Sequence, residues 1–321
     1  MRIVSLLPSA TEIVCALGAR HQLVGRSHEC DFPADVAALP VLTSTKVKPS
    51  PSSLAIDKSV RDVLKQALAV YDVDERKLAE LAPDIIVTQD LCDVCAVSYD
   101  QVCAAAKQIA GKEVKIVSLH PTRFGEIFDD IRKVAAAIGR EAEGAKLLAD
   151  LDGRVKKLAD RAKFNNTKPS ILTIEWLDPV MIGGTWMPEM AELASAEALL
   201  ATAGKQAQTV DLKTLESIDP EVVLIKPCGF GIDRIIAELP VLQRNLPWSD
   251  WTAPLQGRVY AADGNQFFNR PGPRIVDSLE IMAACIHPKQ FRDFRIQYSK
   301  SVIEIEQDLN VKRWSEEYIG L

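Results

Sequence analysis

The sequence predicts an α/β protein with two Rossmann-like lobes, which are joined by a single long rigid helix and separated by a cleft. The first observation behind this prediction is a motif that occurs twice. In each copy, residues 78–88 and 215–225, a short helix ends at a proline and leads into a buried apolar strand. The second observation is a long stretch of helical periodicity between the two copies. Each half of the chain is therefore expected to fold as its own α/β unit.

Further strands repeat in the same order in the two halves. One is expected at residues 2–6 and again at 170–174, and another at 114–118 and again at 258–262. The first half is longer because it contains the segment 45–74, which starts with a Pro- and Ser-rich run and continues as an amphipathic helix. This segment is interpreted as an insertion in the first lobe.

The connection between the halves is predicted to be one helix. Residues 123–163 have apolar side chains at helical spacing, and Gly139 and Gly144 are the only weak points. A helix of that length spans roughly 60 Å at 1.5 Å per residue. The expected domains are an N-terminal lobe at 1–121, a linking helix at 122–164, and a C-terminal lobe at 165–321 with C-terminal helices, one of them over 297–321.

Composition indicates a globular protein that binds small molecules. The chain has 321 residues, is 47% hydrophobic and 26% charged, and has a net charge of −6, which argues against nucleic acid as a partner. No apolar run is long enough to cross a bilayer. The first strand starts at Arg2 and leaves no room for a secretory signal, so the chain is expected in the cytoplasm. It is expected in the periplasm or outside the cell if Met1 begins a shortened chain.

Polar and aromatic residues follow the strands in both halves. In an open α/β sheet, ligands bind at the carboxyl ends of the strands, and flat aromatic rings suit a large, partly planar ligand. The alternative for each aromatic ring is that it packs the lobe interface. The candidate ligand-binding residues are His28, Glu29, Cys30, Gln89, Cys92, Cys95, Trp176, Trp186, Cys228, Phe230, Gln266, Phe267, Phe268 and Arg270.

The chain has seven cysteines, an odd number that does not indicate a disulfide framework. Cys92 and Cys95 form a Cys-x-x-Cys motif, which together with His28 and Cys30 could hold zinc or act as a redox pair. A single such motif is a weak signal, so ligand contact or loop packing is favoured over a zinc or thiol-redox enzyme. No nucleophile elbow, Walker loop or Gly-x-Gly-x-x-Gly loop after the first strand is present. Ser9 and Glu12 are interpreted as a capping box.

Several segments together resemble a known family. They are residues 2–18, 23–25, 31–33, 81–87 and 270–274. These segments are similar to the helical-backbone (class III) solute-binding proteins of ABC importers, which carry vitamin B12, haem and iron siderophores, and the resemblance covers roughly residues 2–290. Within that family, segments 28–33, 89–95 and 183–186 resemble the cobalamin-binding branch.

The resemblance implies a binding protein, not an enzyme, that needs no cofactor and takes a corrinoid between its lobes, for ABC-type import or for handling inside the cell. Haem or a ferric siderophore is the alternative ligand. An ABC permease is the expected protein partner, with Lys213 at a position where family members present a Glu. His28, Gln89, Gln266 and Arg270 are expected to hydrogen-bond the ligand, and His28, Cys30, Cys92 or Cys95 to approach its metal. The tryptophans of well-known B12 carriers are replaced here by Gln89 and by Ala207 or Gln208.

Overall fold

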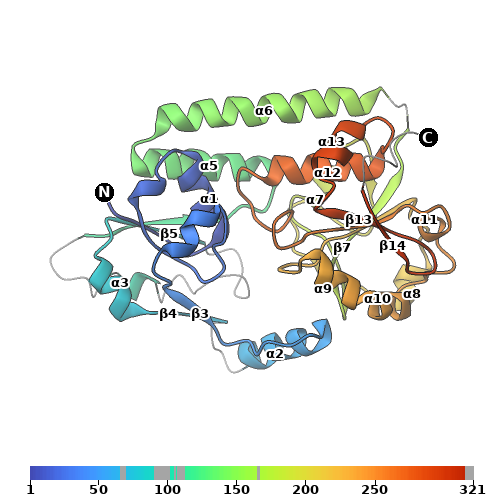
Figure 1. The fold of residues 1–321 in the computed structure, drawn as a ribbon, viewed down its shortest axis with the longest axis horizontal. Coiled ribbons are helices and arrows are strands. Elements are labelled where there is room, and N and C mark those ends of the chain that lie inside the picture. The colour runs from blue at the N-terminus through green and yellow to red at the C-terminus, as the bar shows by residue number, and fades with distance from the viewer. Residues whose placement is uncertain (66–69, 90–101, 105, 107–112, 165–166, 315–321) are drawn as a thin grey trace.

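The computed structural model describes residues 1–65, 70–89, 102–104, 106, 113–164 and 167–314. Figure 1 shows two α/β lobes side by side, with helix α6 along one side of both and α5 between α6 and the first lobe. The predicted fold class of two lobes with a helical backbone is confirmed. In the described part of the chain, no helix combines the length and the apolar character that crossing a membrane requires.

Four parallel strands form the N-terminal sheet, in the order β2-β1-β5-β6. They are β1 (Ile3–Ser5), β2 (Leu23–Arg26), β5 (Ile85–Gln89) and β6 (Lys115–Leu119). Every residue of β1 and β5 is buried, as expected for parallel strands that are covered on both faces. Helix α1 (Pro8–Ala16) packs on one face and α3 (Glu75–Leu81) on the other. Short 3-10 helices at Arg20–Gln22 and Ala34–Ala38 flank β2.

The C-terminal sheet has eight strands on the path β10-β8-β7-β11-β12-β13-β14, with β9 beside β7. Its central strands β7, β11 and β12 are parallel, and the strands beyond them on the path are antiparallel to their neighbours. The strands are β7 (Ser170–Leu177), β8 (Val180–Ile182), β9 (Glu197–Ala198), β10 (Gln208–Thr209), β11 (Val222–Ile225), β12 (Val259–Ala262), β13 (Val302–Ile305) and β14 (Val311–Arg313).

Helices cover both faces of this sheet. Helices α7 and α12 share a buried cluster with one face, and α8 to α11 share a cluster with the other. The helices are α7 (Met187–Leu193), α8 (Leu212–Glu216), α9 (Ile232–Ala237), α10 (Leu239–Asn245), α11 (Thr252–Leu255), α12 (Ile275–Ile286) and α13 (Arg292–Gln297).

Both copies of the repeated motif fold as predicted. Helix α3 ends before Pro83 and leads into β5, and α8 ends before Pro220 and leads into β11. Proline cannot donate the hydrogen bond that would continue a helix. The motif therefore leads into a fully buried parallel strand in each sheet, β5 in the first and β11 in the second.

The prediction of a helix over residues 297–321 is wrong for the part that the structure describes. Strands β13 and β14 form a hairpin there, and β13 pairs antiparallel with β12 from Val259↔Ile305 to Ala262↔Val302. Val302, Ile303 and Ile305 are buried. β-branched side chains favour strands, and they cover an edge of β12 that would otherwise be open.

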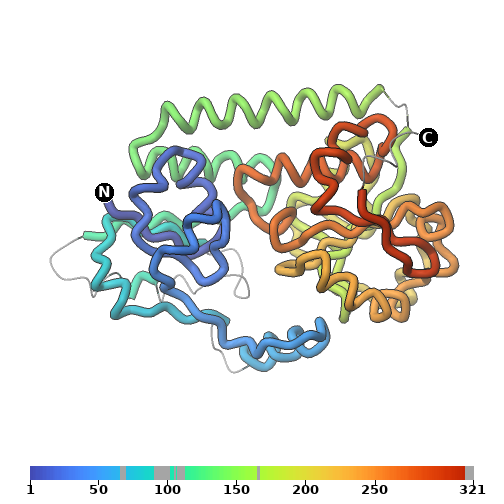
Figure 2. Tube along the Cα trace, viewed as in Figure 1, coloured from blue at the N-terminus to red at the C-terminus, as the bar shows by residue number. Residues whose placement is uncertain are grey.

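The predicted single linking helix is also wrong, because the segment folds as two packed helices. Helix α5 (Phe124–Ile138) ends at Gly139, which has a left-handed φ of 67°, and α6 (Glu141–Lys163) follows. A Cβ atom on Gly144 would lie 2.7 Å from the Cβ of Ala135, so the helices need glycine at this close approach. The 23 residues of α6 span about 35 Å. Figure 2 shows the chain turning back after α5 before α6 runs along both lobes.

One apolar cluster joins the lobes through these helices. It contains residues of β1, α1, α5, α6, α7 and α12. Helix α6 is tied further to the second lobe by Arg154, whose guanidinium lies 2.5 Å from Asp277 and 2.8 Å from Glu280. Interiors packed in this way deform little. The helical side of the molecule is therefore a rigid connection, as predicted, although its form differs.

The insertion in the first lobe is built on a short ribbon. Strands β3 (Thr43–Thr45) and β4 (Tyr71–Val73) pair antiparallel at its base, and α2 (Ser53–Lys65) is the amphipathic helix predicted within it. Although α2 belongs to the first lobe, it lies beside α9 of the second lobe on the side of the molecule opposite α6 (Figure 1). The division into domains at 1–121, 122–164 and 165–321 remains a proposal.

Asp130 of α5 provides a test of this core. Its carboxyl is buried, and Oδ2 has no hydrogen-bond partner. Burial raises the pKa of Asp130 to about 6, above that of an ordinary aspartate. The folded protein therefore prefers the protonated acid, and this contribution to stability is lost as the pH rises from about 4 to 6. We expect Asp130→Asn to increase the free energy of unfolding by about 1–2 kcal/mol at pH 7.5 and to have little effect at pH 4.

Urea denaturation at the two pH values measures this difference. Asp129→Asn is the matched control, because Asp129 is exposed and pairs with the nearby Arg132 on the same helix. An Asp130 variant that changes stability equally at both pH values would contradict the prediction.

Candidate functional site

Loops from the carboxyl ends of the strands meet where the two lobes face each other. Residues 27–33 follow β2 in the first lobe, and residues 263–274 follow β12 in the second. Asn265 donates a hydrogen bond to Asp31 across the junction, at 3.0 Å. We call the surfaces formed by these strand ends and loops the interlobe face. It is the edge at which open α/β sheets bind ligands.

Four charged residues join the lobes at this face, and we call them the interlobe clamp: Glu12, Asp31, Arg270 and Arg274. Arg274 forms a two-point contact with the Glu12 carboxylate, at 2.9 and 2.6 Å. Arg270 contacts Asp31 at 2.5 and 3.1 Å and Glu12 at 3.4 Å. Arg270 is expected from the sequence to bind the ligand, but the structure places its guanidinium in this network.

The clamp keeps its charges although Glu12 and Arg270 are buried. Burial lowers the pKa of Arg270, but the Asp31 carboxylate outweighs this and raises it overall. Burial likewise raises the pKa of Asp31, yet the hydrogen bonds and charge of Arg270 hold it below its ordinary value. Planar guanidinium groups are suited to such paired contacts with carboxylates. Arg270 and Asp31 therefore remain ionised throughout the neutral range.

The predicted capping box at Ser9 and Glu12 is wrong. Helix α1 begins at Pro8, and its N-cap residue, Leu7, has no capping side chain. Proline is pre-organised for the first helical position, so the helix starts at Pro8, two residues earlier than a Ser9 cap would allow. Glu12 is left to face the second lobe, where the two arginines neutralise it.

Four of the five candidate aromatic rings are buried, namely Trp186, Phe230, Phe267 and Phe268. The indole N–H of Trp186 donates to the carbonyl of Phe268 at 3.0 Å. Trp176 is half-buried, and its ring contacts the ring of Phe230 edge-on, with 5.1 Å between centroids. The alternative of packing therefore describes most of these rings, and Trp176 is the one with surface left for a ligand.

His28 is the candidate with the most specific environment. Its Nδ1 lies 2.7 Å from Thr43 Oγ1, whose own proton goes to Ser27 Oγ, so Nδ1–H is the donor. In the described part of the chain, Nε2 has no hydrogen-bond partner. Burial lowers the pKa of His28, with the Glu29 carboxylate acting in the opposite direction, and the ring is therefore neutral at pH 7. Neutral imidazole with one nitrogen held and the other free is the form that binds metals.

Glu29 and Cys228 come from different lobes and lie near each other. The Glu29 carboxylate accepts a hydrogen bond from Tyr71, and the Tyr71 ring contacts His28 at 5.3 Å between centroids. Cys228 is exposed in the loop after β11. The surrounding protein removes water from the thiol, and the negative charges of Glu175 and Glu29 add to this effect. Together they raise the pKa of Cys228 to about 12. Cys228 is thus a neutral thiol at pH 7 and a poor nucleophile.

The predicted zinc or redox cluster is not assembled by the residues that can be described. Cys30 is 2% exposed and accepts a hydrogen bond from Thr11, and burial raises the pKa of its thiol to about 11. Among the described residues, no group of three His, Cys, Asp or Glu side chains could hold a metal ion. Cys92 and Cys95 lie outside the described residues.

The two candidate glutamines differ in position. Gln89 is the last residue of β5 and is nearly buried at the edge of the N-terminal sheet. Gln266 is exposed, and its amide donates to Asp263 at 2.8 Å. Both lie at the carboxyl ends of strands of the parallel cores.

One ion pair with a buried lysine is not predicted from the sequence. Lys226, at the end of β11, is 1% exposed, and its Nζ lies 2.6 Å from Glu175 and 3.1 Å from Asn269. The signal that could have revealed it is a lysine that directly follows four apolar strand residues, because a buried ammonium needs a carboxylate partner. This lysine is therefore not a free cation for a ligand.

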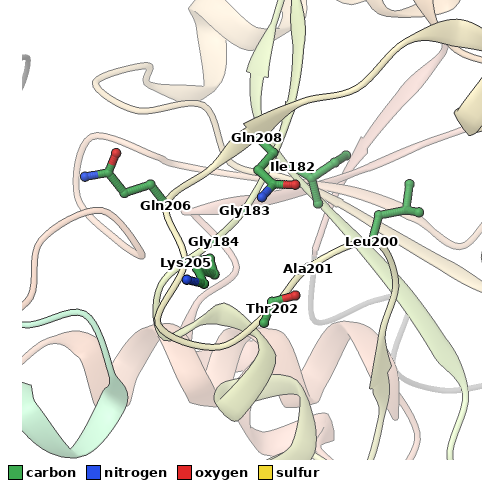
Figure 3. A pocket seen from close by; sticks show the side chains of 9 residues that line it. All are labelled: Ile182, Gly183, Gly184, Leu200, Ala201, Thr202, Lys205, Gln206 and Gln208. Atoms are coloured by element: carbon green, nitrogen blue, oxygen red, sulfur yellow. The ribbon is translucent and has the colours of Figure 1, made fainter.

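Two hollows lie away from these residues. One, beside the turn at Gly183 and Gly184, holds about 10 Å³, which is room for a single water (Figure 3). The other, of about 330 Å³, is lined by Arg258, His287 and Lys289 among others, at the amino ends of the C-terminal strands. Neither lies at the interlobe face, where the fold predicts the ligand site.

The fold and these contacts define a two-lobed α/β binding protein whose lobes face each other across a fixed junction. The chain belongs to the periplasmic binding protein family, whose model matches residues 3–265. That family consists of binding proteins, so the prediction that the chain is not an enzyme is confirmed, and the zinc or thiol-redox alternative is overturned.

Relatives of the chain agree with this assignment. It is 23% identical over 298 residues to the uncharacterized ABC transporter substrate-binding lipoprotein YvrC of Bacillus subtilis (strain 168), a match that covers 91% of this chain and 82% of that protein. The periplasmic heme-binding protein RhuT from Roseiflexus sp. RS-1 has a TM-score of 0.67 and 20% identity, covering 91% of this chain and 98% of its own. The periplasmic vitamin B12 binding protein BtuF of Vibrio cholerae has a TM-score of 0.63 and 18% identity, covering 92% and 97%.

The expectation of a cytoplasmic protein is wrong. The family is one of periplasmic binding proteins, and the relative from Bacillus subtilis is a lipoprotein. That expectation rested on the short run before the first strand, which is no guide to location because a sequence can begin at any point of a longer chain.

The interlobe clamp can be tested by removing one charge. We expect Glu12→Gln to lower the free energy of unfolding by about 3 kcal/mol, because it leaves two buried guanidinium groups with one carboxylate. Glu143→Gln is the control, since Glu143 pairs with Arg140 on the surface of α6 and should leave the denaturation midpoint nearly unchanged. Equal midpoint losses in the two variants would show that the clamp is not specially stabilising.

Proposed function

We propose that this chain is the solute-binding protein of an ABC importer and that it binds a corrinoid, such as cobalamin, between its lobes. The observation that carries the proposal is His28. Its Nδ1–H is held by Thr43 and its Nε2 lone pair has no partner in the described part of the chain, which is the arrangement of a metal-binding imidazole. Imidazole is a suitable axial ligand for cobalt.

The charges at the interlobe face favour a ligand with neutral amide groups. Both arginines of the clamp are paired with carboxylates, and so is Lys226. Glu29 is held by the Tyr71 hydroxyl, and within the described residues no lysine or arginine pairs with it. An uncompensated carboxylate repels anionic ligands. The amide-bearing edge of a corrinoid suits this surface better than the propionates of haem or an anionic ferric siderophore.

The remaining candidates supply complementary contacts. The partly exposed face of Trp176 offers flat apolar surface, and the amides of Gln89 and Gln266 can pair with amide groups of a corrin. The known binding of vitamin B12 by one structural relative and of haem by another supports a metal tetrapyrrole as the ligand class. The relative from Bacillus subtilis is named as an ABC transporter substrate-binding lipoprotein, which supports a permease as the protein partner.

Haem is the second candidate, because the same His28 geometry suits iron. A spectroscopic titration separates the two. We expect hydroxocobalamin to bind with micromolar or tighter affinity and to change its visible spectrum as an imidazole replaces the cobalt-bound water. Haem added under the same conditions should give a weaker or no Soret shift. The corrinoid assignment fails if hydroxocobalamin and cyanocobalamin leave both the visible spectrum and tryptophan emission unchanged at micromolar concentrations.

Substitutions at the imidazole and its support test the geometry. We expect His28→Ala to abolish the visible shift and Thr43→Val to weaken hydroxocobalamin binding about tenfold, because a metal-binding histidine depends on the partner of its other nitrogen. His21→Ala and Ser44→Ala are the controls, since both residues are exposed and lie outside this contact. A Thr43→Val protein that is folded by circular dichroism and binds as tightly as Ser44→Ala would argue against a held imidazole.

A further inference from the structure

The insertion of the first lobe reaches the second lobe and bonds to it. We call residues 46–65 the strap. Its base is fixed in the first lobe by the β3-β4 pairing and by Lys46, whose Nζ lies 2.7 Å from Asp72. The amide of Lys48 donates to Ser59 of α2 at 3.2 Å, which folds the strap back on itself. The strap is therefore a defined element and not a loose loop.

The tip of the strap is held by one carboxylate of the second lobe. The amide N–H of Ser53, the first residue of α2, lies 3.1 and 3.0 Å from the two carboxylate oxygens of Glu238. Glu238 is 4% exposed and Ser53 is 1% exposed, so the contact is shielded from water. A carboxylate at a helix N-terminus is favoured because the first amides have no partner within the helix and the helix dipole is positive there.

A second contact connects the strap to the aromatic side of the second lobe. Arg234 donates to the carbonyl of Ser50 at 2.7 Å, and its guanidinium lies over the Phe230 ring at 3.7 Å. The Phe230 ring in turn contacts Trp176. Ile56 of α2 packs against the apolar cluster that includes Phe230. The strap thus meets the second lobe next to the ring that has surface left for a ligand.

The strap and the α5-α6 pair connect the lobes on opposite sides (Figure 1). The α5-α6 side is joined by a continuous apolar core and lies beside the buried interlobe clamp. Among the described residues, the contacts that join the strap side are one two-oxygen contact, one carbonyl contact and one half-buried isoleucine. Opening free energy follows the number of buried contacts that must break, so the strap side opens first.

We propose that the strap is a latch, that Glu238 holds it closed, and that it must open for a ligand to pass between the lobes. The last part rests on the proposed function, because it concerns the ligand of the interlobe face. A latch that is separate from the ligand contacts slows binding and release together. Its loss therefore speeds both steps and leaves the equilibrium affinity nearly unchanged.

Hydrogen exchange of the full-length protein tests the latch without any ligand. In the unmodified chain, amides of α2 should exchange at least a hundredfold faster than those of β5 and α5, because the strap opens while the core stays folded. Glu238→Gln should speed exchange in the first turn of α2 about tenfold, since it replaces a charged acceptor by a neutral one. Exchange of α2 only at the rate of the core, or no change in the variant, would overturn the proposal.

Asp233→Asn is the matched control. Asp233 lies in helix α9, whose C-cap residue is Glu238, and its exposed side chain lies 3.8 Å from Arg313. It should leave the exchange of α2 unchanged. Equal acceleration in both variants would assign the effect to the lost charge and not to the latch.

Stopped-flow binding of hydroxocobalamin tests passage of the ligand. Glu238→Gln should raise the association and dissociation rate constants several-fold each, with Kd within about threefold of the unmodified protein. Faster dissociation alone would make Glu238 a ligand contact, and unchanged rates would mean that the strap does not gate passage. If hydroxocobalamin does not bind the unmodified chain, the proposed function fails, while the exchange experiment still decides whether the strap is a latch.

Discussion

The position of one lobe relative to the other depends on the interlobe clamp and the apolar core beside it. Glu12 and Arg270 are nearly buried, and their charges would be costly in the interior if the lobes separated without admitting water. With the lobes together, each charge has an opposite partner at hydrogen-bond distance. The geometry of the interlobe face is therefore set by the protein itself, which limits the ordering that a ligand must impose on binding.

The clamp also determines the chemistry that remains at the interlobe face. Because its arginines are occupied, the face presents the lone pair of His28, the carboxylate of Glu29 and neutral amides and rings. This set differs from a site built for an anion, in which guanidinium or ammonium groups are left free. The pairing of these arginines therefore supports the proposal of a ligand without anionic groups.

Local patterns in the sequence predict the buried strands of the two sheets but not the contacts between segments that are distant in the chain. The buried strands could be predicted because they are continuous apolar runs introduced by Pro83 and Pro220. The sequence alone does not distinguish a glycine that ends a helix, such as Gly139, from a glycine within a continuous helix. The close packing of Gly144 in α6 against Ala135 in α5 decides between the two arrangements. For Arg270, nothing near it in the chain shows that its partners in the structure are Glu12 and Asp31.

The same limit explains why the strap was predicted as an insertion but not as a connection between lobes. Its amphipathic helix is visible in the sequence, whereas the carboxylate at its N-terminus comes from Glu238, in the other half of the chain. The clamp combines four charges with a continuous core beside it, and the strap depends mainly on one carboxylate and one amide. Two connections of such unequal strength make the lobes fixed on one side and separable on the other. Among the described residues, the fewest contacts between the lobes have to break past α2, and this is the side on which the proposed latch opens.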